Sequence, residues 1–205
     1  MDYRSEEMDI AVNPQVLVDL VRDAYEFFAE NKVEERYRFL AMDLIRRYVS
    51  REGLPREADP LFGAALFIVI RHAWSHPNPL TKTDFAAKMR MKESSLEWYT
   101  ESIVDKIGFE TLHDKNHLPF YVDPQGTIAR VIDSVVRGNV GEEVVRSIVR
   151  GNMVSAHSLA EKIVDQLCRV VKIVPAAFEQ GLLKLVKRMI EEESRRLLTE
   201  LEGRK

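Results

Sequence analysis

Hydrophobic residues recur with helical spacing along most of the chain, and the alternating pattern typical of strands is nearly absent. The clearest stripe predicts a helix over about 33–51, and its members are Val33, Tyr37, Leu40, Ala41, Leu44, Ile45 and Tyr48. The stretch from Leu61 to Ile70 differs because it is apolar on every side, which is typical of a helix surrounded by other helices. Three further helices are expected, one starting at Pro14 and the others over 83–89 and about 94–107. The pattern therefore predicts an all-α protein.

The second half of the chain is also helical in pattern, after a polar segment over 109–122 that contains Pro119. We expect this segment to be a linker between a helical domain over 1–108 and a second helical subdomain over 123–205. Helices are predicted near 124–137, 140–150, 156–172 and 175–202, with Gly138 and Gly151 each ending one of them. The last predicted helix is long, and its far end is either a solvated tail or a surface through which two copies form a homodimer.

The composition is that of a folded globular chain, with 45% hydrophobic and 31% charged residues among 205. A formal charge of −3 does not demand a nucleic acid as partner. The single cysteine excludes an internal disulfide and a cysteine-rich zinc site. The N-terminus has neither the basic start nor the apolar run of a secretory signal, and no stretch reaches the roughly 20 apolar residues that span a bilayer. We therefore expect a cytoplasmic protein without membrane contact.

The order of the first five predicted helices resembles the cyclin box, and most closely the core repeats of transcription factor IIB. An alanine-rich buried helix ending in Arg71 is followed by a capped turn and a short helix, and then by a fifth helix after a brief turn. The resemblance covers about residues 14–108 and is carried by Gly53-Leu54, Gly63–Arg71, Leu80–Ala86 and Ser94–Ile107. Phe85-Ala86 stands where the family has an Ile-Ala-like pair. The second half is at most a degenerate repeat, since it lacks an alanine-rich core helix.

This resemblance implies a non-enzymatic, transcription-linked interaction module, because the family's repeats bind proteins and duplex DNA through basic helix ends. Residues 81–106 also have the pattern of a helix-turn-helix, with candidate phosphate contacts at Lys82, Lys88, Arg90 and Lys92. However, the would-be recognition helix carries several acidic residues, and the charge over 61–110 sums to zero. The chain also lacks cysteines for the family's zinc ribbon. We therefore expect a protein partner, with weak duplex DNA contact as a secondary prediction and an ordinary solvated turn as its alternative.

A second hypothesis is a metal-dependent phosphohydrolase, because the order His72, His113-Asp114, Asp165 resembles the HD-domain enzymes. Those enzymes hold a metal that generates a hydroxide for attack on a phosphoester. The Ile-Gly pair that usually follows the His-Asp pair is missing here, and Asp133 is an alternative to Asp165. Glycine-rich phosphate-binding loops are absent, so we expect no nucleotide cofactor. Cys168 lies on an apolar helix face and is expected to be a small buried hydrophobe. A helical assembly protein is the third hypothesis.

Overall fold

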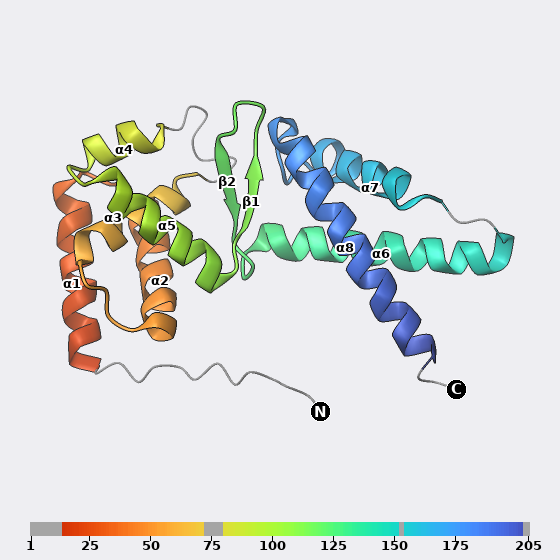
Figure 1. The fold of residues 1–205 in the computed structure, drawn as a ribbon, viewed down its shortest axis with the longest axis horizontal. Helices are drawn as coiled ribbons and strands as arrows, with labels where there is room; N and C mark the ends of the chain where they lie inside the picture. The colour runs from red at the N-terminus through yellow and green to blue at the C-terminus, as the bar shows by residue number, and fades with distance from the viewer. Residues whose placement is uncertain (1–13, 72–79, 152–153, 203–205) are drawn as a thin grey trace. The chain divides into compact units, whose positions relative to one another are not determined.

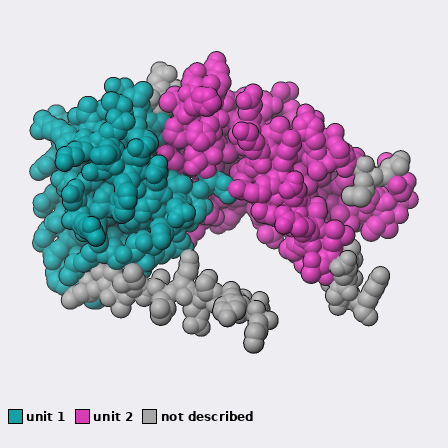
Figure 2. All heavy atoms as spheres, in the orientation of Figure 1, with its two compact units in different colours: residues 1–110 teal, residues 111–205 magenta. Residues whose placement is uncertain are grey.

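The computed structural model describes residues 14–71, 80–151 and 154–202, and Figure 1 shows their fold. These residues form eight α-helices, a two-stranded sheet and two short helical turns of other types, which confirms the all-α class. The chain divides into two compact units, residues 1–110 and 111–205, which Figure 2 distinguishes by colour. Within the described ranges, no helix combines the length and the apolar character needed to cross a bilayer.

Unit 1 is built around its third helix. Its helices are α1 (Pro14–Glu30), α2 (Glu35–Glu52), α3 (Ala58–Val69), α4 (Lys82–Lys88) and α5 (Glu93–Ile107). Helix α3 packs against α1, α2 and α5, and every residue from Pro60 to Ile68 is buried. A Cβ at Gly63 would overlap with Cε of Met91, so glycine here makes room for that side chain. The expectation of a helix enclosed by its neighbours is confirmed.

Local signals in the sequence set the ends of the helices around this core. The Thr81 side chain accepts a hydrogen bond of 3.1 Å from the backbone N–H of Asp84, which caps α4 as its sequence predicts. Gly108 ends α5 with φ of 83°, a conformation that glycine adopts without strain. The buried Arg71 lies over the Phe67 ring, 4.0 Å from its centroid, and its Nη2 donates to the carbonyl oxygen of Leu80. Arg71 therefore holds the chain at both sides of residues 72–79.

Unit 2 consists of a small hairpin and three helices. Strands β1 (Glu110–His113, its first residue in unit 1) and β2 (Pro119–Val122) form the sheet, followed by α6 (Thr127–Arg150), α7 (Ala156–Asp165) and α8 (Glu179–Glu202). A π-helical turn over Gln166–Val170 extends α7, and a 3-10 turn over Ala176–Phe178 precedes α8. Helix α8 packs against both α6 and α7. Their shared core includes Ile132, Val136, Ile163, Leu182 and Val186.

The segment expected to be a linker contains this ordered hairpin. Leu112, Phe120 and Val122 bury their side chains, and the Asp114 carboxylate accepts the backbone N–H groups of Asn116 and Leu118 at 2.8 Å each. These two bonds close the turn between the strands. Helix α8 also lies close to β1, because a Cβ at Gly181 would be 3.0 Å from the backbone nitrogen of His113.

Helix α6 is continuous where the sequence analysis predicted two helices, so that prediction was wrong. Gly138 does not adopt a positive φ, whereas Gly151 does, at 72°, and ends the helix as expected. Asn139 does not cap a new helix. Its Nδ2 donates to the carbonyl oxygen of Val135 at 2.9 Å and to Oε1 of Gln166 at 3.2 Å. A contact with the π-helical turn, which spacing along the chain does not reveal, accounts for the asparagine.

Candidate functional site

A groove of about 660 Å³ lies in unit 1 between the end of α2, the loop over 53–57 and one side of α5. We call it the α2–α5 groove. Both buried and exposed aromatic side chains line it, together with the loop's Leu54 and Pro55 and several serine hydroxyls of α5. All the lining residues belong to unit 1, so the groove is complete within that unit.

The loop side of the groove exists because α2 ends abruptly. Gly53 has φ of 80°, and its N–H donates to the carbonyl oxygen of Val49 at 2.9 Å. Pro55 then lacks the N–H that a continuing helix would need. The backbone N–H of Glu57 donates to the Tyr99 hydroxyl at 3.4 Å, which ties the end of the loop to α5. The loop is therefore held at both ends, with Leu54 half exposed between them.

Two buried tyrosines form the base of the groove. Tyr48 and Tyr99 expose only 4% and 6% of their surface. The Tyr48 hydroxyl and Oγ of Ser102 are 2.7 Å apart and share a hydrogen bond between α2 and α5. Burial raises the pKa of Tyr48, and the hydrogen bond with Ser102 only partly opposes this effect. The phenol therefore stays neutral at physiological pH, where it can form hydrogen bonds but cannot act as a base.

The rim of the groove presents an aromatic anchor. Trp98 is 60% exposed, and its ring meets the Tyr99 ring edge to face with centroids 4.7 Å apart. This contact holds the indole in a defined orientation although most of it faces solvent. On the same rim, Lys106 Nζ lies 3.5 Å from Oε1 of Glu52. The charged lining residues are Glu52, Glu57, Arg56 and Lys106, so they sum to zero.

The basic residues predicted to contact phosphates lie on α4, α5 and the turn that joins them. Lys82 begins α4, and its Nζ pairs with Oε1 of Glu97 on α5 at 2.6 Å, so an acidic neighbour already compensates its charge. Lys88 ends α4, Arg90 turns the chain with φ of 54°, and Lys92 directly precedes α5 without a capping bond from its side chain; all three are exposed. The exposed acidic residues of α5 recur every fourth position and form one stripe: Glu93, Glu97, Glu101 and Asp105.

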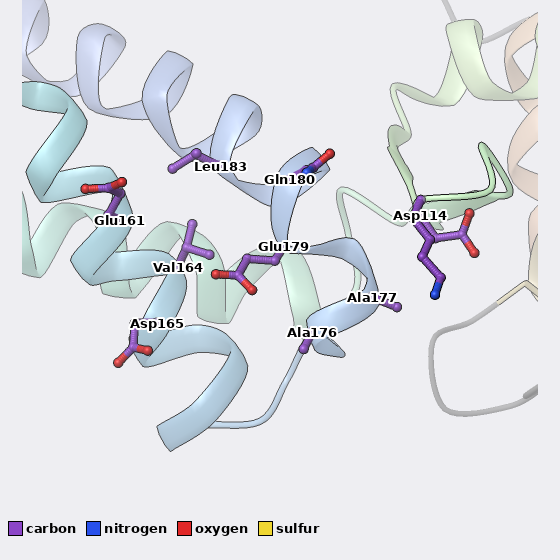
Figure 3. A pocket seen from close by; sticks show the side chains of 10 residues that line it. Asp114, Glu161, Val164, Asp165, Ala176, Ala177, Glu179, Gln180 and Leu183 are labelled. Carbon is purple, nitrogen blue, oxygen red and sulfur yellow. The ribbon is translucent and has the colours of Figure 1, made fainter.

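Two residues of the alternative metal set share a pocket of about 830 Å³ in unit 2, shown in Figure 3. Asp114, on the hairpin turn, and Asp165, at the end of α7, line it from opposite sides, with Ala176 and Ala177 between them (Figure 3). Asp165 pairs with Arg169 at 3.1 Å.

The remaining candidates of this set are dispersed. His113 is exposed on β1, Asp133 pairs with Arg137 on α6 at 3.0 Å, and His72 lies outside the described residues. In the part of the chain that the structure describes, no three His, Cys, Asp or Glu side chains come together as metal ligands would. Burial, followed by the nearby Glu179 carboxylate, raises the pKa of the Cys168 thiol, which disfavours the reactive thiolate.

Gly53-Leu54 was used in the sequence-based prediction only as part of the resemblance to the cyclin box, and the loop was missed as part of a site. A usable signal was present in Leu54, since a leucine between glycine and proline cannot join the buried stripe of a helix. Trp98 carried a second signal, because it falls outside the buried stripe of α5, which is Leu96, Tyr99, Ile103 and Ile107. The approach of the loop to α5 depends on tertiary packing, which periodicity does not encode.

The sequence matches no known protein-family model, and a search of curated proteins finds no significant relative. The resemblance to the cyclin box and to transcription factor IIB therefore stays a prediction.

Proposed function

We propose that the protein is a non-enzymatic interaction module that binds an extended segment of a protein partner in the α2–α5 groove. The observation that supports this most is Trp98, which is 60% exposed yet oriented by the Tyr99 ring. Tryptophan is among the residues that contribute most to protein interfaces when a partner covers it, and a pre-oriented ring loses little entropy on binding.

The other groove residues suit the backbone of a peptide. Serine hydroxyls donate and accept hydrogen bonds, which matches the alternating N–H and C=O groups of an extended chain. Leu54 and Pro55 provide apolar surface next to Trp98 for a hydrophobic side chain of the partner. We therefore expect the bound segment to carry at least one large apolar residue.

Charge favours a peptide over a nucleic acid at this groove. The lining charges cancel, whereas proteins that bind nucleic acids gain most of their affinity from uncompensated lysine and arginine. Duplex contact at Lys88, Arg90 and Lys92 is a separate proposal, and the acidic stripe of α5 opposes it. The transcription link rests only on the resemblance to transcription factor IIB.

A displayed library of random peptides, selected on the full chain, tests the proposal. Peptides enriched on the wild type are measured against Trp98→Ala, where loss of the anchor should weaken binding by about thirtyfold or more, as for a hot-spot residue of roughly 2 kcal/mol. The matched control is Phe39→Ala, because Phe39 is 76% exposed on α2 of the same unit but does not line the groove. In a Trp74→Phe background, Trp98 emission reports binding directly.

The proposal is supported if the selected peptides bind Phe39→Ala as tightly as the wild type, lose affinity for Trp98→Ala and shift the Trp98 emission. Absence of any enriched peptide, or equal binding to both variants, contradicts it.

A labelled DNA duplex titrated across a salt series tests the second proposal. Binding that weakens with salt, and weakens further in a Lys88→Glu/Arg90→Glu variant, would place the phosphate contact at the α4–α5 turn.

A further inference from the structure

The face of α6 that points away from the core of unit 2 carries an uncharged stripe. The core side of the helix is marked by Ile132, Val136 and Val140. On the opposite side, positions separated alternately by three and four residues hold small or aliphatic side chains: Val131, Ser134, Gly138, Gly141, Val145 and Ile148. We call this stripe the α6 seam. Its spacing is the heptad pattern that one helix presents to another in a coiled coil.

The aliphatic end of the seam is strongly exposed. Val145, Ile148 and the adjacent Val149 expose 62%, 74% and 77% of their surface. Single exposed hydrophobic residues are common, but a cluster on one helix face usually marks an interaction surface. A Cβ at Gly138 or Gly141 would meet nothing within 4 Å, so unit 2 itself has no packing reason for either glycine. Both glycines would let a second helix approach closely.

We propose that the occupant of this face is α6 of a second copy, aligned parallel and in register. A helix with this seam is already encoded in the chain, and the charges that flank the seam complement each other in that arrangement. Arg137 precedes Gly138, and Glu142 follows Gly141, on opposite sides of the seam. In a parallel pair, flanking positions five residues apart meet across the interface. Arg137 of each copy then lies near Glu142 of the other, which gives two symmetric ion pairs.

The opposite orientation lacks this complementarity. In an antiparallel pair, each flank of one helix meets the same flank of the other helix. The flank that carries Arg130 and Arg137 would then face the same two arginines of the second copy. Arg137 already pairs with Asp133 at 3.0 Å and also acts on the Glu193 carboxylate of α8 in the same unit. The Arg137 and Asp133 side chains are about half exposed, so Glu142 of a second copy can still approach the guanidinium from outside the unit. This surface lies on α6 in unit 2. It differs from the last helix, whose far end the sequence pattern left as either a solvated tail or a dimer surface, and from the proposed peptide groove in unit 1.

Molecular mass measured by light scattering and sedimentation over a dilution series tests the proposal. We expect the wild type to shift from dimer to monomer on dilution, and Val145→Glu to raise the dimer dissociation constant at least about tenfold, since it buries an unpaired charge at the seam. Val170→Glu is the matched control, because Val170 is 72% exposed in the same unit but lies on the π-helical turn. Circular dichroism checks that both variants stay folded.

Orientation is tested by cross-linking and charge exchange. In a Cys168→Ser background, Ser134→Cys and Ile148→Cys should each form a disulfide between copies if the helices are parallel, whereas an antiparallel pair allows at most one of them. Arg137→Glu and Glu142→Arg should each weaken the dimer, and the double variant should restore it. A monomeric mass at every concentration, equal weakening by Val145→Glu and Val170→Glu, or cross-linking at only one position would overturn the proposal.

Discussion

Replacing Gly138 by alanine tests whether α6 is one continuous helix. Gly138 is exposed, its φ is not positive, and an added Cβ would meet nothing within 4 Å. Alanine in a helix interior is favoured over glycine by about 0.8–1 kcal/mol, because glycine loses more backbone entropy on folding. With no contact to oppose this gain, we expect Gly138→Ala to raise the free energy of unfolding of unit 2 by about 1 kcal/mol.

Gly63→Ala is the matched contrast because it makes the same exchange inside another helix. There the new Cβ would meet Cε and Sδ of Met91, which are the far end of a flexible and only partly buried side chain. This side chain has to move aside, and its displacement offsets part of the gain in helix propensity. We therefore expect Gly63→Ala to stabilise unit 1 by less than Gly138→Ala stabilises unit 2.

Urea unfolding followed by circular dichroism measures both effects. Both exchanges are made in a Val145→Glu background, at a concentration where sedimentation gives a monomeric mass, so that the proposed dimerisation does not enter the Gly138→Ala result. A rise in the urea midpoint at an unchanged slope is the expected outcome for Gly138→Ala. A fall of 1 kcal/mol or more would refute the reasoning, because it would mean that residue 138 needs a positive φ and ends a helix, as sequence pattern alone suggested.

Three further changes are expected to shift stability. Burial raises the pKa of Tyr48, so the stabilisation from the neutral phenol is complete below pH 10 and is lost as the pH rises through the pKa of the folded state. Tyr48→Phe should therefore flatten the fall in urea midpoint measured above pH 10. The hydrogen bond from Arg196 lowers the pKa of Glu193 below its ordinary 4.5, so this carboxylate stabilises unit 2 above pH 4.5 and loses that effect as the pH falls below 4.5. Arg196→Gln should reduce the drop in urea midpoint below pH 4.5, and an unchanged acid profile would contradict this. Because the Thr81 hydroxyl caps α4, Thr81→Ala should lower the free energy of unfolding by about 1 kcal/mol, and Thr81→Ser should retain most of it. Equal stability of the two variants would exclude the cap.

Features set by neighbours along the chain were predictable from sequence. The all-round apolar run over 61–70 indicated a central helix, and the Thr81 cap and the Gly108 end both follow from the chemistry of single residues. The hairpin was missed because its strands are only four residues long and its burial alternates through just a few side chains. Pro119 read as a break, although it is the first residue of β2, where proline is tolerated.

Features set by contacts between distant segments were not predictable in this way. Gly138-Asn139 and Gly151-Asn152 look alike in sequence, yet only Gly151 ends a helix. Within the continuous helix, Asn139 is bonded to Gln166, which lies 27 positions away, and sequence spacing does not reveal this contact. The candidate groove has the same origin, since the loop after α2 reaches α5 through the bond between Glu57 and Tyr99. The position of Trp98 outside the buried stripe of α5 was a signal for an exposed anchor, but nothing in the sequence indicated the surface beside it.

The enclosure of α3 limits how far this protein's sequence can drift. A helix with one solvated face can accept new polar residues there, but the residues from Pro60 to Ile68 all lie inside the unit. A larger side chain would push into a neighbouring helix, and a smaller one would leave a cavity. Substitutions in this segment should therefore be accepted mainly together with compensating changes in α1, α2 or α5. Distant relatives of this chain should be recognised by this short segment sooner than by any surface feature.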